Sequence, residues 1–276
     1  MIVQHNMSAL NTNRQLGITN GKLAKSTEKL ASGYRVNRAA DDAAGLSISE
    51  KMRSQIRGLD QASSNAQDGQ SLIQTAEGAM GEIHEVLQRM RELTVQASND
   101  TNVTADRESI ALELEALSSE IDRIASQTEF NTMKLLDGNF TSKQLQVGAN
   151  ALQTMTISIS TMDAEALGVD DGTIGNIVSV SDGSTITKLI SDIDLAITSV
   201  SKARAKLGAI QNRLDHTINN ADNMSENLQS AESKIRDVNM ADEMVTYSAK
   251  SILQQAGQSM LAQANQATQG VLSLLR

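Results

Sequence analysis

The sequence predicts a mainly α-helical protein: a long antiparallel helical bundle or coiled coil that carries one small β-hairpin. Three observations predict this fold class. Apolar residues recur every seven residues through two segments of about fifty residues each, 48–97 and 186–238. The 276 residues include no proline, so no helix is forced to kink. There are only two Phe, two Tyr and no Trp, so Leu, Ile, Ala and Met must fill the core.

The later segment, 186–238, has the heptad pattern of a helix that packs along one face against a partner helix. Its first apolar row is Ile186, Ile193, Val200, Leu207, Leu214, Ala221, Leu228 and Ile235, and its second is Leu189, Ala196, Ala203, Ile210, Met224, Ala231 and Val238. Only Thr217 interrupts the second row. At about 1.5 Å per residue the helix is roughly 75 to 80 Å long, so we expect a partner helix of similar length.

The earlier segment, 48–97, repeats this design and is expected to be that partner. Its first row is Leu59, Ala66, Ile73, Met80 and Leu87, and its second is Ala62, Gly69, Ala76, Ile83, Met90 and Ala97. A further helix is predicted from Thr104, as a helix-capping residue, to about residue 127, with Ile110, Leu114, Leu117, Ile121 and Ile124 in the heptad positions. The loop 99–102 is short, so these two helices should form an antiparallel hairpin.

The two ends of the chain are predicted to be amphipathic helices, over residues 1–31 and 241–276. The first carries apolar rows that include Ile2, Val3, Leu10, Leu16, Leu23 and Leu30, and the last a stripe through Val245, Ala249, Ile252, Ala256, Met260, Ala264, Ala267, Val271 and Leu274. Each has one apolar stripe and is otherwise polar, and an isolated helix of this kind is marginally stable. We expect the two to pair with each other and to order fully when several copies of the chain share them.

The pattern changes between residues 130 and 185. Residues 145–147 and 155–159 alternate apolar and polar side chains around a turn at 148–150, which predicts a β-hairpin at about 141–160. Residues 163–185 are predicted to be an exposed loop. The expected division is an inner domain of residues 1–31 and 241–276, connectors 32–47 and 236–240, and a rod-like domain of residues 48–185 and 186–235.

Composition excludes several function classes. A net charge of -9 and a pI near 4.9 argue against nucleic-acid binding, which depends on clustered Lys and Arg. The N-terminal residues lack the pattern of a cleaved signal peptide, and no stretch approaches the eighteen apolar residues of a membrane span. The absence of Cys excludes disulfides and Cys-ligated zinc.

No catalytic or metal site is predicted, and no cofactor is expected. The one zinc-peptidase-like stretch begins at His84-Glu85, but the second histidine that this motif needs is replaced by Gln88. The three histidines, His5, His84 and His216, lie on separate predicted helices. Asp41 and Asp42 are expected to cap a connector or to pair with Arg35 or Arg38, in preference to binding a cation.

Two long motifs resemble the ends of bacterial flagellin. The first reads Leu30-Ala-Ser-Gly-Tyr-Arg-Val-Asn-Arg-Ala-Ala-Asp-Asp-Ala-Ala-Gly-Leu-Ser-Ile-Ser49, and the second Met260-Leu-Ala-Gln-Ala-Asn-Gln-Ala-Thr-Gln-Gly-Val-Leu-Ser-Leu-Leu-Arg276. The resemblance covers about residues 1–160 and 186–276. Too few residues remain between these ranges for the outer domains that many flagellins insert, so the chain looks like a minimal flagellin.

The resemblance implies a structural subunit that polymerises into the filament used for swimming, with the terminal helices as an inner coiled coil. The implied polymerisation residues are Ile2, Val3, Leu10, Leu16, Leu23, Leu30, Val245, Ile252, Met260, Val271, Leu274 and Leu275. It further implies an extracellular filament built after export without a cleaved signal peptide. The implied partners are the chain itself, an export chaperone at the C-terminal helix, and hook-associated and cap proteins.

Residues 87–96 resemble the flagellin segment that Toll-like receptor 5 recognises, and this receptor is therefore an expected partner. The candidate contacts are Gln88, Arg89, Arg91, Glu92, Leu93 and Glu113. Arg89 offers a forked donor, and Leu93 is expected to be an apolar anchor on the surface of the helix. The same face could instead serve packing between subunits.

Two further alternatives are open at this point. The Ser- and Thr-rich stretch after Met155 could carry O-linked glycans or could simply be solvated. The chain could also be a hook–filament junction protein or another exported coiled-coil protein of the flagellum, because the ends of such proteins look similar.

Overall fold

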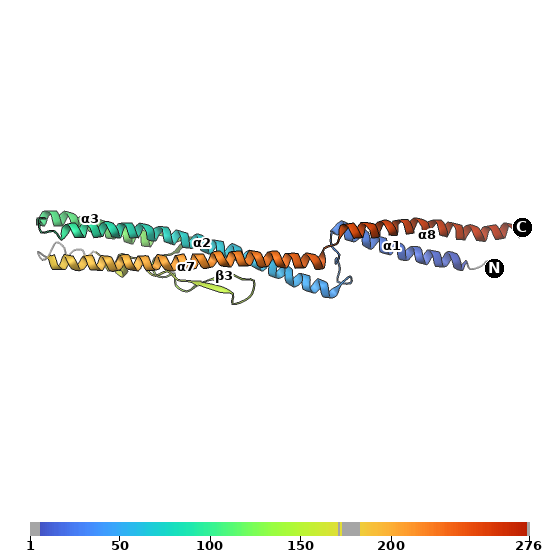
Figure 1. The fold of residues 1–276 in the computed structure, drawn as a ribbon, viewed down its shortest axis with the longest axis horizontal. Coiled ribbons are helices and arrows are strands. Elements are labelled where there is room, and N and C mark those ends of the chain that lie inside the picture. The colour runs from blue at the N-terminus through green and yellow to red at the C-terminus, as the bar shows by residue number, and fades with distance from the viewer. Residues whose placement is uncertain (1–5, 171, 173–182, 275–276) are drawn as a thin grey trace. The chain divides into compact units, whose positions relative to one another are not determined.

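The computed structural model describes residues 6–170, 172 and 183–274, and side chains within helices as far as residue 267. The chain forms two compact units, one made of Met1–Gln55 with Glu226–Arg276 and the other of Ile56–Ser225. Helices α2 (Ala43–Ala97) and α7 (Gly183–Arg236) contribute residues to both units (Figure 1). The predicted mainly helical fold, with long paired helices and a small antiparallel hairpin, is confirmed.

The terminal unit is built on an antiparallel pair, α1 (Met7–Ser32) and α8 (Met240–Leu274), which lie side by side in Figure 1. Asn6 caps α1, since its side chain accepts the backbone N–H of Ala9. Gly33 ends the helix with a φ of +75°, a conformation that glycine adopts without a steric penalty. Helix α1 therefore ends one residue after the predicted end at residue 31.

The two short segments that follow α1 and precede α8 pair with each other. Tyr34 and Asp237 form an antiparallel bridge, and the N–H of Val238 donates to the carbonyl of Gly33 at 3.0 Å. The guanidinium of Arg236 lies 4.5 Å from the centre of the Tyr34 ring. Val36 is buried. The segment between α1 and α2 is therefore ordered, but it is shorter than the predicted connector 32–47, because α2 already begins at Ala43.

The second unit is a bundle of α2, α3 (Thr104–Gln127) and α7. Helix α2 runs antiparallel to both neighbours, since Arg89 pairs with Glu113 of α3, and Arg91 and Glu77 pair with Asp194 and Arg204 of α7. Its core contains the predicted heptad residues, including Ile73, Met80, Ile83, Leu87, Leu114, Ile121, Ile186, Ile193, Val200, Leu207 and Leu214. The predicted a/d pattern is therefore confirmed in this bundle.

The predicted details differ from the structure at three points. Met224, a predicted core position of α7, is half exposed, and α7 ends at Arg236, two residues before the expected end. The first apolar row of α7 is buried from Ile186 to Ala221 and only partly buried after Ala221. Thr104 is the first residue of α3 and not its cap; the N–H of the capping residue Val103 donates to the carboxylate of Asp106.

Two small hairpins lie on this bundle. Strands β3 (Lys143–Gln146) and β4 (Thr154–Ile157) pair antiparallel with Leu145 opposite Met155, within the predicted range. Strands β1 (Glu129–Phe130) and β2 (Met133–Lys134) form a second hairpin that the sequence did not predict. Its turn residues, Asn131 and Thr132, have φ values of 48° and 64°, in the left-handed region.

The prediction that residues 163–185 form an exposed loop is wrong for residues 163–170. This part contains the short helix α4 (Ala164–Leu167), and Ala164, Leu167 and Val169 are buried. The buried Ser118 hydroxyl of α3 donates to the carbonyl of Val169 at 3.0 Å, which fastens the segment to the bundle. The apolar side chains among its Gly and Asp residues explain the burial. Most of the remaining residues of the predicted loop lie outside the described residues.

Candidate functional site

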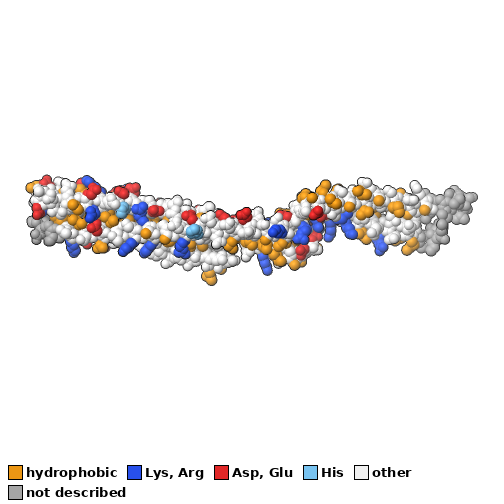
Figure 2. Space-filling model, viewed as in Figure 1, with side chains coloured by type: hydrophobic (Ala, Val, Ile, Leu, Met, Phe, Trp, Pro, Cys, Tyr) orange, Lys and Arg blue, Asp and Glu red, His pale blue; other side chains and the backbone are white. Residues whose placement is uncertain are grey.

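The terminal helix pair exposes a large number of apolar side chains, which we call the open apolar face. On α1 these are Met7, Leu10 and Ile18, and on α8 they are Met240, Met244, Val245, Ile252, Leu253 and Met260, each with about half or more of its surface exposed. Figure 2 shows apolar side chains at the surface along α8. Exposed apolar side chains that gather on one element mark an interaction site.

The stripe predicted on α8 is not the face that packs against α1. Val245, Ile252 and Met260 are 70%, 65% and 59% exposed, although the stripe was expected to pair with the N-terminal helix. The partly buried residues of α8 are Glu243, Thr246, Tyr247, Lys250, Ser251, Gln254, Gly257, Leu261 and Ala264, of which only Ala264 belongs to the predicted stripe. The predicted pairing of the two terminal helices is confirmed, but most of this stripe does not form their contact and is left open.

Polar contacts and one glycine hold α1 against α8. The side-chain amide of Asn6 donates to the carbonyl of Ala264 at 2.9 Å, and the Lys250 ammonium donates to the buried Ser26 hydroxyl at 2.9 Å. Between these contacts, a Cβ on Gly257 would lie 3.2 Å from Leu16 Cδ1, so the helices approach closely there. Polar groups that need specific partners fix the register of such a pair.

A groove of about 400 Å³ opens between the two helices. Its apolar wall is formed by Leu16 of α1 and by Leu253, Ala256, Gly257 and Met260 of α8. The groove continues the open apolar face, since Leu253 and Met260 belong to both.

The predicted polymerisation residues fall into three groups in the structure. Leu10, Val245, Ile252 and Met260 are exposed, whereas Leu16, Leu23 and Leu30 are partly buried within the pair. Ile2, Val3 and Leu275 lie outside the described residues, as do the side chains of Val271 and Leu274. The sequence analysis missed Leu253, Met244 and Ile18, which lie beside the predicted rows and widen the exposed face.

The predicted receptor segment presents an ion-pair cluster across α2 and α3. The Arg89 guanidinium donates to one oxygen of Glu113 through Nη2 at 2.8 Å and Nε at 3.2 Å, and to Glu92 through Nη1 at 3.3 Å. The hydrogen bonds with Glu113, followed by those with Glu92, raise the pKa of Arg89. About half of the Arg89 and Glu113 side chains stays exposed, so the cluster is available at the surface.

The other candidates of this segment are placed differently. Leu93 is only 2% exposed and belongs to the bundle core, so the expected apolar anchor on the helix surface is wrong. It continues the buried row of α2, three residues after Met90. Gln88 is exposed, with its side chain hydrogen-bonded to His84, and Arg91 is held by Asp194 of α7 at 2.7 Å, a partner that the sequence analysis missed.

The aspartates of the connector act locally. Asp42 accepts the N–H of Gly45 at the start of α2, and Asp41 accepts the N–H of Arg38 and lies 3.5 Å from Lys25. The hydrogen bond from Arg38 lowers the pKa of Asp41 from its ordinary 3.8. Across residues 6–170, 172 and 183–274, no three His, Cys, Asp or Glu side chains gather as a metal site would need. In the same residues no helix combines the length and apolar character of a membrane span.

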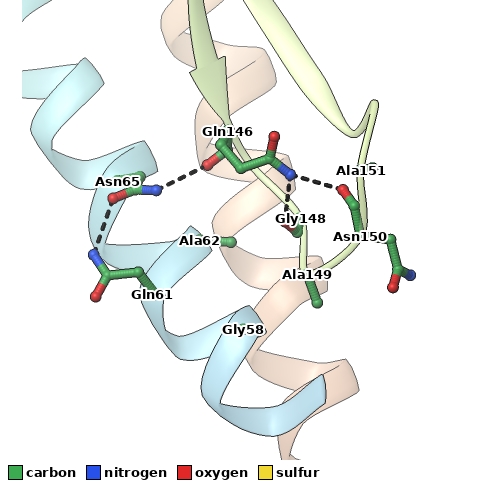
Figure 3. A pocket seen from close by; sticks show the side chains of 9 residues that line it. All are labelled: Gly58, Gln61, Ala62, Asn65, Gln146, Gly148, Ala149, Asn150 and Ala151. Carbon is green, nitrogen blue, oxygen red and sulfur yellow. Dashed lines mark hydrogen bonds between the residues drawn. The ribbon is translucent and has the colours of Figure 1, made fainter. Parts of the chain in front are cut away.

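The tip of the β3–β4 hairpin lies against α2 beside a depression of about 340 Å³ (Figure 3). The Asn65 amide donates to the carbonyl of Gln146, whose own amide donates to the carbonyls of Gly148 and Asn150. A Cβ on Gly58 would come within 2.8 Å of Ala149, so this close approach requires glycine. The depression is a by-product of that docking, lined mainly by small and amide side chains.

The chain is similar to known proteins along most of its length. Residues 3–141 match the bacterial flagellin N-terminal helical region, and residues 190–275 match the bacterial flagellin C-terminal helical region. The chain is 54% identical to a flagellin of Halalkalibacterium halodurans and 51% identical to a flagellin of Bacillus subtilis, and each alignment covers all of both chains.

A solved structure assigned to a flagellar hook-associated protein of Vibrio parahaemolyticus shares the fold. The TM-score is 0.61 with 16% identity, over 71% of this chain and all of that one. Identity this low speaks for the fold alone, whereas the identity to flagellins extends from end to end. The chain therefore belongs to the bacterial flagellins, the subunits of the extracellular flagellar filament.

Proposed function

We propose that the open apolar face of the terminal helix pair is the surface through which this subunit polymerises. The observation that carries the proposal is the exposure of Leu10, Val245, Ile252 and Met260 on two helices that pack against each other along one side. Full burial of one such side chain contributes about 1.5 to 3 kcal/mol. Several of them, covered at once by a second copy, supply the main drive for association.

The residue composition of this surface favours a second copy of the chain as the partner that buries it. Residues 251–275 contain no Asp, Glu, Lys or Arg, so this part of α8 depends on apolar burial and amide hydrogen bonds and not on charge pairing. A filament needs contacts between different patches of successive copies, which repeat along a screw axis and do not close into a ring. The groove beside Leu16, which is lined by residues of both helices, adds a concave part to the surface of α8.

The test compares one substitution on the face with a matched substitution elsewhere. Ile252→Ser on α8 and Leu112→Ser on α3 each replace an aliphatic side chain that is about two-thirds exposed. We expect Ile252→Ser to raise the critical concentration for polymerisation, measured by sedimentation, by about tenfold or more, which is 1.4 kcal/mol per subunit. Leu112→Ser should polymerise as the unmodified chain does. Equal critical concentrations for the two variants would overturn the proposal.

The proposal extends to the domain organisation. In the filament, residues 1–31 and 241–276 form the inner domain, residues 32–47 and 236–240 the connectors, and residues 48–235 the surrounding rod. The different surfaces of the two helical sets support this division, since the long helices bury their apolar rows within one chain and the terminal helices do not.

We also propose that the Arg89–Glu113 cluster is a contact for Toll-like receptor 5, with Gln88, Arg91 and Glu92 beside it. The supporting observation is that Arg89 is bound on one side by Glu113 and Glu92 yet keeps about half of its side chain exposed. A guanidinium that its neighbours hold in place loses less entropy when a partner binds it. Leu93 supports this contact from the core, by packing beneath the segment.

The exposed face of α8 supports two further assignments. A single subunit before assembly needs a temporary cover for Val245, Ile252 and Leu253, and an export chaperone that binds the C-terminal helix supplies one. Hook-associated and cap proteins meet the same face at the ends of the filament. These partners would compete with polymerisation, because they cover the same residues.

A further inference from the structure

We propose that Met260 is an oxidation site through which hydrogen peroxide controls whether a free subunit can join the polymer. Conversion of its thioether to a sulfoxide would bar the subunit from assembly, and reduction would restore it. The inference rests on the proposed function, since it requires the open apolar face to be the polymerisation surface.

Met260 is accessible and central to that face. Its side chain is 59% exposed and lines the groove between α1 and α8 together with Leu16, Leu253 and Gly257. Met80 and Met90, in the bundle core, are fully buried. Methionine oxidation follows exposure, so peroxide should reach Met260 in a free subunit while these two are protected.

The chemical step needs only the thioether and the oxidant. The Met260 sulfur uses a lone pair to attack one oxygen of hydrogen peroxide, an S–O bond forms, and the O–O bond breaks. The sulfur is oxidised by two electrons, and the leaving hydroxide takes up the remaining proton to give water. The chain has no cysteine, so its thioethers are the sulfur groups that the oxidant meets.

The product no longer suits the surface. A sulfoxide is polar and chiral, and burying its oxygen under the apolar side chains of a second copy costs free energy when no donor reaches it. Residues 251–275 contain no Lys or Arg whose charged donor could bind this oxygen. One oxygen atom at Met260 therefore acts directly on the contact that drives assembly.

The test lets oxidised and intact subunits compete in one sample. The full chain is treated as a monomer with hydrogen peroxide until about half of Met260 is sulfoxide, polymerised, and separated into pellet and supernatant for peptide mass spectrometry. We expect the Met260 sulfoxide to be enriched about tenfold in the supernatant. Met133 on β2, which is 41% exposed and lies in the other unit, is the internal control and should divide evenly.

The outcomes separate this inference from the proposed function. If the two sulfoxides divide alike, the role of Met260 is refuted while polymerisation itself stands. If Ile252→Ser polymerises as readily as Leu112→Ser, the assembly surface has been placed wrongly, and the inference falls with it.

The peroxide sensitivity of polymerisation in two variants tests the proposal independently. Met260→Leu keeps a similar apolar volume but has no thioether at this position, so its critical concentration should be the same before and after peroxide treatment, whatever that concentration is. Met133→Leu should stay sensitive to peroxide, and a methionine sulfoxide reductase should restore its assembly. Equal sensitivity of both variants would assign the effect to other exposed methionines, such as Met7 or Met244, and would overturn the proposal.

Discussion

Arg89 has a structural role, and we propose a recognition role for the same side chain. Its guanidinium joins α2 to α3 through Glu113, and Glu92 holds it from the same helix. An exposed ion pair of this kind contributes about 0 to 1 kcal/mol to stability. A charge that a partner covers completely is worth more, because its loss leaves the partner's group unpaired.

We therefore predict that Arg89→Glu weakens binding to Toll-like receptor 5 by about tenfold or more, or 1.4 kcal/mol, with little change in melting temperature. The double variant Arg89→Glu with Glu113→Arg restores the ion pair between the helices but exchanges the charges that a receptor would meet. It should stay defective in a surface plasmon resonance assay. Arg123→Glu, which loses a pair within α3, is the control and should bind normally. Recovery of binding in the double variant would reduce Arg89 to a structural residue.

Single positions mark where sequence reasoning was least accurate. Leu93 was expected on the surface because a motif drew attention to it, yet it continues the buried row of α2. Arg91 was placed correctly on an exposed face, but its partner Asp194 lies 103 residues away, and periodicity says nothing about pairs at that distance. Which of two adjacent faces a helix buries depends on its neighbour.

At the scale of elements, the docking of the β3–β4 hairpin on α2 depends on two glycines. A Cβ on Gly58 would meet the side chain of Ala149 at 2.8 Å and its backbone at 3.1 Å, and a Cβ on Gly69 would meet Leu145. Gly78, in the same helix, has open space around it. Glycine within a helix costs about 1 kcal/mol relative to alanine, so the two docking positions accept that cost for close packing.

This contrast predicts opposite signs for one substitution. Gly78→Ala should stabilise the protein by about 1 kcal/mol through helix propensity. Gly58→Ala makes the same gain but must displace the hairpin tip, and overpacking costs about 1 to 3 kcal/mol, so the net effect should be neutral to about 2 kcal/mol destabilising. Thermal unfolding followed by circular dichroism measures both variants. Equal stabilisation by the two would show that the hairpin is not docked closely on α2.

Elements with a long period were predictable, and short ones were not. The heptad rows located α2, α3 and α7 and most of their core, because a repeat sustained over many turns leaves little choice of face. The β1–β2 hairpin has strands of two residues, too short for any alternation to be detected. On α8 the apolar stripe and the partner helix α1 were both predicted correctly, but the contacting face was not: the face that carries the polar contacts to Asn6 and Ser26 lies toward α1.

At the scale of the whole molecule, the two units differ in how much of their apolar surface a single chain buries. The bundle buries its apolar rows within one chain, whereas the terminal pair does not. Local opening is easiest where few apolar contacts are buried. In the filament that we propose, neighbouring subunits cover the apolar side chains that the terminal pair leaves exposed.

We predict that in a dilute subunit the amides of α1 and α8 exchange much faster than those of α2 and α7 near Ile73 and Ile193, and that polymerisation slows this exchange by about tenfold or more, as expected for contacts worth at least 1.4 kcal/mol. Hydrogen exchange with mass spectrometry measures both states. Deletion of residues 241–276 should leave the bundle folded and unable to polymerise. Strong protection of the terminal helices in the dilute subunit, or loss of the whole helical signal on deletion, would contradict this view.

The contact between Asn6 and Ala264 joins residues 258 positions apart. A chain that is delivered from its first residue therefore cannot form the α1–α8 pair until almost all of it has arrived. Until then α1 has no partner helix. The bundle, whose residues lie between α1 and α8 in the sequence, can already fold. If the terminal pair is the polymerisation surface, as we propose, the antiparallel arrangement sets an order of events: a subunit can join others only after its last helix has been delivered.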